Sequence, residues 1–191
     1  AHANQADPLP RQLLDMNAVS REVVLQYLPL AHEKQQDLGW VQAVNEQGQE
    51  VGAPVSGNEA ELHEALSNLV HNAIHYAPVG ARITVSVSRV DNRAEVAVSD
   101  NGPGLEPLLR ARAFARFERV GTDKPVASSG SGLGLAIARA YARRNDGDIE
   151  LRDGEPNEQG GVGLASVVWL PLAPTVSQYP RPADVEFTGE Q

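Results

Sequence analysis

The sequence contains no cysteine, which excludes a disulfide framework and any metal site that needs thiolate ligands. It also lacks an uninterrupted run of about 18 apolar residues, so no membrane-spanning helix is predicted. Basic residues are outnumbered, with 16 Lys and Arg against 25 Asp and Glu, for a formal net charge of −9. This acidic balance argues against a chain that wraps nucleic acid by bulk charge, and we expect no nucleic-acid partner.

The composition that remains is ordinary for a globular protein, with 41% hydrophobic and 21% charged residues. A length of 191 residues suits one domain with a substantial core. Glycine is unevenly distributed, because several of the 17 glycines cluster at positions 102–104 and 130–134. Clustered glycines indicate tight turns or a close approach of the backbone to a ligand.

The spacing of apolar residues predicts both helices and strands. Steps of three and four residues indicate helices over about 17–31, 59–77 and 133–145, the second beginning at an Asn58 cap and the third ending at a Gly147 cap. Strands are expected at residues 38–44, 51–55, 82–90, 94–98, 148–151 and 162–170. This order predicts an α/β fold: a two-layer sandwich with one mixed, mostly antiparallel sheet of about five strands, covered on one face by three helices.

The two ends of the chain lack such periodicity. Residues 1–16 are expected to be a linker or a cut end, and the domain is predicted to span residues 17–172. The tail at residues 173–191 contains Pro174, Pro180 and Pro182 without a periodic pattern, so we expect disorder there.

The second predicted helix has a polar face beside its apolar stripe. Asn68, Asn72, His75 and Tyr76 fall on this face at three- and four-residue spacing. Asparagine is a poor residue for a helix interior, so two of them one turn apart need a reason. Either these are solvated polar residues, or the side-chain carbonyl of Asn72 ligates a hard cation such as Mg²⁺.

A carboxylate stands at the end of the strand predicted at residues 94–98. Asp100 is followed by Gly102 and Gly104, so a ligand amine could donate to the carboxylate while the backbone approaches closely. The alternative interpretation is an Asx turn that closes the strand.

A glycine-rich run, residues 128–135, opens the third predicted helix. The free N–H groups at such a helix start can bind phosphate. A Rossmann motif is excluded because a long loop, not a strand, precedes the run, and a Walker A motif is excluded because no Gly-Lys-Ser/Thr occurs.

An Arg- and Phe-bearing segment, residues 110–120, lies between the two glycine clusters in a region that is otherwise loop-rich. Its arginines could reach a polyphosphate. A surface helix with two buried Phe is the alternative.

Taken together, these four segments resemble the ATP-binding catalytic domain of bacterial sensor histidine kinases, in the superfamily that includes gyrase and the heat-shock chaperone ATPases. The match covers roughly residues 17–172. Residues 68–78, 100–104, 114–120 and 130–135 resemble, in that order, the family's asparagine box, first glycine box, phenylalanine box and second glycine box. One box alone is weak, whereas four in the family's order and approximate spacing are specific.

The resemblance implies a Bergerat-type ATP-binding fold and a role for most of these residues. Asn72 would ligate a Mg²⁺ that bridges the ATP phosphates, and Asp100 would accept a hydrogen bond from the adenine amine. Arg116 or Arg119 would contact the γ-phosphate, and the stretch from about 105 to 131 would form a mobile lid. The other residues implied to contact the nucleotide are Asn68, His75, Tyr76, Gly102, Gly104, Gly130, Ser131, Gly132, Leu133, Gly134 and Leu135.

One position in the resemblance separates a kinase from an ATPase. The ATPase relatives have a Glu one turn before the metal-binding Asn, where it activates water, and this chain has Asn68 there. An amide does not accept a proton at neutral pH, so we expect slow hydrolysis and transfer of the γ-phosphoryl group to a protein histidine. Two alternatives stay open: a hydrolytic ATPase of the same superfamily, and a nucleotide-gated interaction module that binds without transfer.

The phosphoacceptor histidine of such kinases is followed by an acidic residue and, a few positions on, by Pro. His32 and His63 each precede a Glu, and neither is followed by that Pro. We therefore expect a monomeric fragment that acts on a separate, histidine-bearing dimerisation domain and through it on a response regulator. The parent protein is expected in the bacterial inner membrane, with this part in the cytoplasm.

Overall fold

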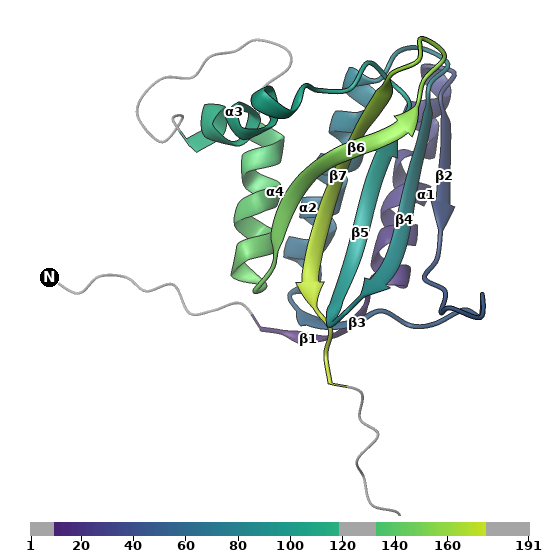
Figure 1. Ribbon diagram of the computed structural model, residues 1–191. Helices are drawn as coiled ribbons and strands as arrows, with labels where there is room; N and C mark the ends of the chain where they lie inside the picture. Colours follow the sequence, from purple (N-terminus) through teal and green to yellow (C-terminus); the bar gives the residue numbers. More distant parts are fainter. Residues whose placement is uncertain (1–9, 119–132, 175–191) are drawn as a thin grey trace, which may run out of the picture.

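The computed structural model describes residues 10–118 and 133–174, and the structural statements below refer to these ranges (Figure 1). Residues 175–191 of the expected tail and much of the expected lid therefore lie outside the described residues. The helices and strands are, in chain order, β1 (Gln12–Asp15), α1 (Met16–Glu33), β2 (Asp37–Val41), β3 (Pro54–Gly57), α2 (Glu59–Tyr76), β4 (Arg82–Val90), β5 (Arg93–Asp100), α3 (Pro107–Glu118), α4 (Leu133–Arg144), β6 (Asp148–Pro156) and β7 (Val162–Pro171).

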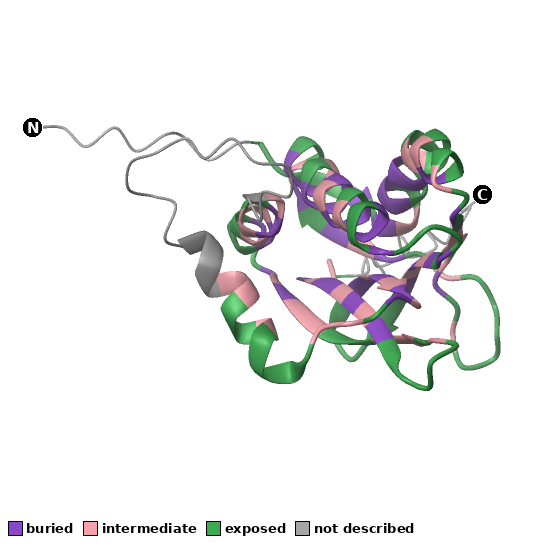
Figure 2. Cartoon of the chain, turned by 90° about the horizontal axis from the view of Figure 1, so that it is seen from above, coloured by how far each residue is buried: buried purple, intermediate pink, exposed green. Residues whose placement is uncertain are grey.

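Five strands form the main sheet in the order β2-β4-β5-β7-β6. β2 runs parallel to β4, and the other neighbouring pairs are antiparallel. Helices α1, α2 and α4 cover one face of this sheet (Figures 1 and 2). The predicted two-layer sandwich with a mixed, mostly antiparallel sheet is confirmed.

The described chain contains a fourth helix, α3, in the region that the sequence indicated to be loop-rich. It covers much of the Arg- and Phe-bearing segment and packs against α4. The Arg139 guanidinium of α4 lies over the Phe114 ring, 4.3 Å from its centroid. Because this cation–π contact joins residues far apart in sequence, a local apolar pattern could not reveal it.

Helix α2 supplies the centre of the core. Its side chains Leu62, Leu66 and Leu69 are each 1% exposed, and burial of one leucine stabilises the fold by about 1.5–3 kcal/mol. Figure 2 shows buried positions concentrated between the helices and the sheet. The predicted cap is present, because the Asn58 side chain accepts a hydrogen bond of 3.0 Å from the Glu61 N–H.

The end of α4 differs from the prediction at Gly147. The left-handed residue is Asp146, with φ of 64°, and Gly147 follows it with its N–H donating to the Ala142 carbonyl at 2.9 Å. This is a Schellman arrangement with Asp in the glycine position. Gly147 is needed for another reason: a Cβ there would lie 2.0 Å from the Trp169 carbonyl oxygen.

The segment expected to be a linker contains part of the fold. Residues 12–15 form β1, which pairs antiparallel with β3, and Asp15 caps α1 by accepting from the Asn17 N–H at 3.0 Å. Asp15 also accepts from the Ala53 N–H at 3.0 Å. A strand of four residues is too short to leave a periodic signal in the sequence. Its pairing partner β3 lies about 40 residues further along the chain, so local sequence does not reveal it either.

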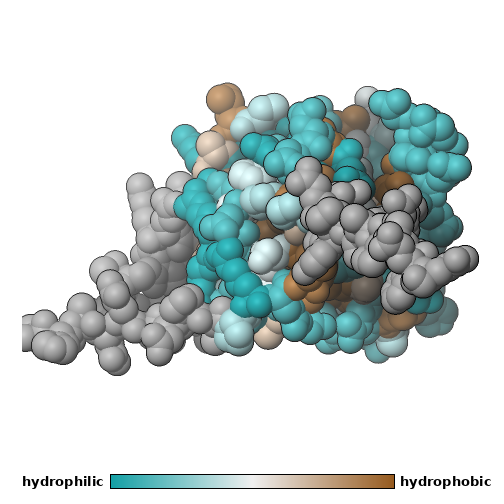
Figure 3. All heavy atoms as spheres, turned by 90° about the horizontal axis from the view of Figure 1, so that it is seen from below, coloured by the Kyte–Doolittle hydropathy of each residue, from teal (hydrophilic) through white to brown (hydrophobic). Residues whose placement is uncertain are grey.

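Large apolar side chains exposed on the surface come from different elements, among them Leu13, Val79 and Leu108. On the face in Figure 3, hydrophobic groups are interspersed among hydrophilic ones. Among the described helices, none has the length and apolar content required to cross a membrane.

Candidate nucleotide-binding site

A cavity of about 350 Å³ opens between α2, the end of β5, α3, the start of α4 and the strands β6 and β7. Its volume lies in the range of small-ligand sites. Most of its wall is apolar, and among the described residues that line it Asp100 is the one that carries a charge. The lining residues are Asn72, Ala73, Tyr76, Val98, Asp100, Pro103, Gly104, Leu105, Ala113, Leu135, Leu151, Leu164 and Ser166.

The Asp100 carboxylate is held in place by the backbone. Its side chain is 8% exposed, and its Oδ1 accepts from the Gly102 N–H at 2.9 Å and from the Leu164 N–H at 3.3 Å. Burial raises the pKa of Asp100, and the two N–H donors oppose that rise. A carboxylate has about four lone-pair sites, so it retains capacity for a ligand donor in the cavity.

Glycines let the backbone close around Asp100. A Cβ at Gly163 would lie 1.9 Å from the Asp100 carbonyl oxygen, and one at Gly154 would lie 2.6 Å from the same atom. Gly104 has a φ of +73° and abuts the Val162 carbonyl. Sequence reasoning missed Gly154 and Gly163. Gly163 falls in a predicted strand and Gly154 falls just beyond one, and the atom that each approaches belongs to another strand, β5.

The raised pKa of Asp100 leads to a testable prediction for the acid titration of its carboxyl group. Asp100 should titrate above its ordinary value of 3.8, because burial disfavours the ionised form in the folded state. Its contribution to stability is therefore complete below pH 3.8 and is lost as the pH rises through the folded-state pKa. Carbon-detected NMR of the Asp100 carboxyl measures the pH at the midpoint of its titration. A midpoint at or below 3.8 would contradict the burial argument, and Asp100→Asn should lack this part of the pH dependence.

The two asparagines of α2 face the start of α4. A Cβ at Gly134 would lie 3.3 Å from Asn72 Oδ1 and 3.7 Å from Asn68 Cβ, so this glycine brings the two helices together. Asn68 Nδ2 is buried and has no hydrogen-bond partner in the described part of the chain. A buried amide donor of this kind is costly unless a ligand satisfies it.

The end of α2 places its two aromatic side chains differently. Tyr76 lines the cavity and is 60% exposed, whereas His75 is exposed and is not among the lining residues. The two rings meet edge to face with their centroids 4.9 Å apart. Any contact of His75 with a phosphate thus stays a prediction.

Some of the predicted contact residues lie at one cavity, whereas others, or their side chains, lie outside the described part of the chain. Asn72, Tyr76, Asp100, Gly104 and Leu135 line it, Gly102 lies beside Asp100, and Asn68 and Gly134 lie at the contact between α2 and α4. Arg119, Gly130, Ser131 and Gly132 lie outside the described residues. Arg116 and Leu133 are helical, and their side chains are outside the description.

Several lining residues were not predicted as contacts. Val98, Leu151, Leu164 and Ser166 come from β5, β6 and β7. The alternation along each strand identifies the side that faces the helices, and this signal could have identified Val98 and Ser166, which lie opposite each other. The alternation says nothing about which end of the strand is left open by the helices.

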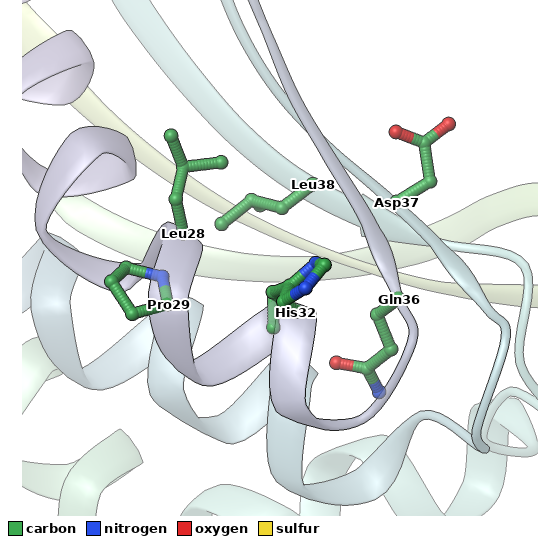
Figure 4. Close-up of a pocket in the computed structure, with 7 residues that line it drawn as sticks. Leu28, Pro29, His32, Gln36, Asp37 and Leu38 are labelled. Atoms are coloured by element: carbon green, nitrogen blue, oxygen red, sulfur yellow. The ribbon is translucent and has the colours of Figure 1, made fainter.

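A second hollow of about 390 Å³ lies where α1 turns into β2 (Figure 4). Leu28, Pro29 and Leu38 make its apolar part, and His32 and Asp37 are its titratable members. Figure 4 shows Gln36 and Asp37 pointing in opposite directions from the turn. These residues do not assemble a pair of acid and base groups around a buried centre, so the first cavity is the candidate site.

Comparison with known proteins gives the family. A profile described as histidine kinase-, DNA gyrase B- and HSP90-like ATPase matches residues 57–174. The signal transduction histidine-protein kinase/phosphatase MprB of Mycobacterium ulcerans is 38% identical over 140 residues, which are 72% of this chain and 27% of that protein. The chain thus spans about a quarter of the length of this relative.

Solved structures agree with this match. A mycobacterial sensor histidine kinase MprB has a TM-score of 0.68 and 25% identity, covering 86% of this chain and 99% of that chain. Full-length ShkA in complex with AMPPNP has a TM-score of 0.65 and 27% identity, covering 85% of this chain and 31% of that chain. The resemblance carried by the four motifs is confirmed: the chain belongs to the family of histidine kinase-, DNA gyrase B- and HSP90-like ATPases.

Proposed function

We propose that the cavity binds the adenosine part of Mg-ATP and that the domain passes the γ-phosphoryl group to a histidine on a separate dimerisation domain. The observation that carries this proposal is the buried Asp100 carboxylate at a mostly apolar cavity that Asn72 also lines. From the phosphohistidine the group would pass to a response regulator. In the parent kinase the domain would face the cytoplasm, consistent with relatives that are sensor kinases.

The cavity suits an adenine ring. Val98, Leu135 and Leu151 supply apolar surface for the faces of the base, and Asp100 supplies an acceptor for its exocyclic amine. The relative ShkA was solved with AMPPNP, and its similarity over 85% of this chain supports the same ligand class here.

The residues on α2 fit a magnesium ion shared with the nucleotide. The amide oxygen of Asn72 is a hard ligand next to the start of α4, and the described residues contain no cluster of three His, Asp or Glu that could hold an ion alone. Mg²⁺ commonly keeps water and phosphate oxygens as its other ligands, and when bound it would offset charge on the phosphates. The buried Asn68 Nδ2, which has no hydrogen-bond partner in the described part of the chain, would donate to an oxygen of the nucleotide phosphates.

Asn68 favours transfer over hydrolysis. Its amide takes no proton at neutral pH, so it provides no base for an attacking water. A hydrolytic ATPase is therefore the less favoured alternative. The experiment below distinguishes a kinase, which transfers the phosphoryl group, from an interaction module, which binds nucleotide without transfer.

The test combines binding with transfer. We expect calorimetry to detect ADP binding in the presence of Mg²⁺, steady ATP turnover below about 1 s⁻¹, and label from γ-labelled ATP on the histidine of a cognate dimerisation domain added in trans. An acceptor whose histidine is replaced by Gln is the matched control. Wild-type chain that binds no adenine nucleotide would overturn the proposal, and binding without label on the acceptor would favour the interaction module.

A further inference from the structure

Two side chains in the turn between α1 and β2 form hydrogen bonds to the end of α2. Lys34 Nζ donates to the carbonyls of Ile74 at 2.6 Å, His75 at 3.2 Å and Ala77 at 3.0 Å. Gln36, which is 7% exposed, donates from Nε2 to the same Ile74 and Ala77 carbonyls, each at 3.0 Å. We call Lys34 and Gln36 the α2 clamp.

The end of α2 needs such donors because of its own sequence. In a continuing helix the N–H of residue 78 would donate to the Ile74 carbonyl, but residue 78 is proline and has no N–H. The helix ends at Tyr76, and its cap residue Ala77 has the extended backbone that a following proline favours. A lysine ammonium at this point also interacts favourably with the negative end of the helix dipole.

The turn that the clamp holds lies against the nucleotide cavity. A Cβ at Gly102 would lie 3.4 Å from Pro78 Cδ and 3.7 Å from Ala77 Cα, so Gly102 rests on this turn. The Gly102 N–H is in turn a donor to the Asp100 carboxylate. Tyr76, which lines the cavity, directly precedes the turn.

Backbone bonds connect the same two segments. The Gly80 N–H donates to the Lys34 carbonyl at 3.3 Å, and the Asp37 N–H donates to the Ala81 carbonyl at 2.9 Å. Figure 4 shows the Gln36 amide directed away from the Asp37 carboxylate, which points to the other side of the turn. The end of α2 is therefore held by the turn between α1 and β2 and by the first residue of β2, none of which lines the cavity.

We propose that Lys34, assisted by Gln36, is a positioning residue for nucleotide binding: it fixes the end of α2 so that Tyr76 and the Gly102–Asp100 pair keep their places at the cavity. This rests on the proposed nucleotide-binding function. Lys34 does not line the cavity, so it would affect ligand affinity indirectly, by holding the turn at Ala77 and Pro78 in position.

The test compares Lys34→Met, which keeps the length of the side chain but removes its donors, with Lys34→Arg, which restores a charged donor. We expect ADP to bind about tenfold more weakly to Lys34→Met, equivalent to ~1.4 kcal/mol, and Lys34→Arg to recover most of this loss. Arg89→Met is the matched control, since Arg89 also donates to a backbone carbonyl, that of Gly52 at 3.4 Å, and does not line the cavity. Should Lys34→Met fail to fold, Lys34→Gln removes the same charge but keeps an amide donor, and a smaller loss of ADP binding than in Lys34→Met is expected.

A second measurement separates positioning from general stability. The amide NMR signals of Gly102 and Tyr76 should shift in Lys34→Met and stay in place in Arg89→Met, at a temperature where both variants are folded. Unchanged signals, or equal weakening of ADP binding in Arg89→Met, would overturn the proposal. If wild type binds no ADP, the proposed function fails, and the amide signals still decide whether Lys34 positions the cavity residues.

Discussion

Replacement of Asp100 by asparagine should weaken ADP binding by at least about 100-fold, a loss of ~2.7 kcal/mol. The carbonyl oxygen of asparagine can still accept from the Gly102 and Leu164 N–H groups that Asp100 Oδ1 serves. The second carboxylate oxygen, however, becomes an NH₂ group, which is a donor facing the donor amine of adenine. Because burial disfavours the carboxylate, the substitution should leave the stability at neutral pH unchanged or raised.

Calorimetry with two nucleotides makes this test specific. Wild type should prefer ADP over inosine diphosphate, which carries a keto oxygen where adenine has its amine, and Asp100→Asn should lose that preference. Asp91→Asn is the matched control, because Asp91 is exposed in the turn between β4 and β5 with a φ of 53° that asparagine tolerates. Equal affinity of wild type and Asp100→Asn for ADP would show that Asp100 does not contact the base.

Replacement of Gly163 by alanine should lower the free energy of unfolding by about 3 kcal/mol or more. The added Cβ would lie 1.9 Å from the Asp100 carbonyl oxygen and 2.6 Å from Asp100 Oδ1. The first of these atoms is backbone in a central strand, which cannot move aside as a flexible side chain can. Urea denaturation measures the loss, and ADP binding should fall with it because β5 and β7 would separate next to Asp100.

Gly39→Ala provides the comparison for a glycine in the same sheet. A Cβ at Gly39 meets nothing within 4 Å, so its free energy of unfolding should stay within about 0.5 kcal/mol of wild type. If Gly163→Ala is as stable as Gly39→Ala, the close approach of β7 to Asp100 is not a constraint on the fold.

The long amphipathic elements were predictable because their signals are local. The apolar stripe of α2, its Asn58 cap and the alternation of β4 and β5 each lie within 20 residues of sequence, and each is present in the structure. The elements that were missed or left as an alternative depend on distant partners. β1 was not predicted and exists by pairing with β3. The helix α3, which the sequence left as an alternative, is positioned in part by the stacking of Arg139 on Phe114.

The candidate site divides in the same way. Asn72 could be predicted as a candidate because asparagine is unusual inside a helix, and Asp100 because it ends a strand and is followed by Gly102 and Gly104. Much of the cavity wall could not, since Leu151 and Leu164 look like ordinary core positions until β6 and β7 are placed. The same applies to the clamp, because nothing local to Lys34 indicates that the end of α2 lies beside it.

The sequence by itself determined the family, through four motifs in order, and with it the two-layer fold and the class of ligand to expect. It also determined that α2 must end near Pro78, because proline removes a backbone donor. Only the tertiary structure decided which residues meet: that the left-handed residue after α4 is Asp146, that Gly163 lies against Asp100, and that Lys34 donates to the Ile74 carbonyl that Pro78 leaves without a donor. The physical reason is that helix and strand propensity act between neighbours in sequence, whereas close backbone approach and hydrogen-bond satisfaction at element ends depend on neighbours in space.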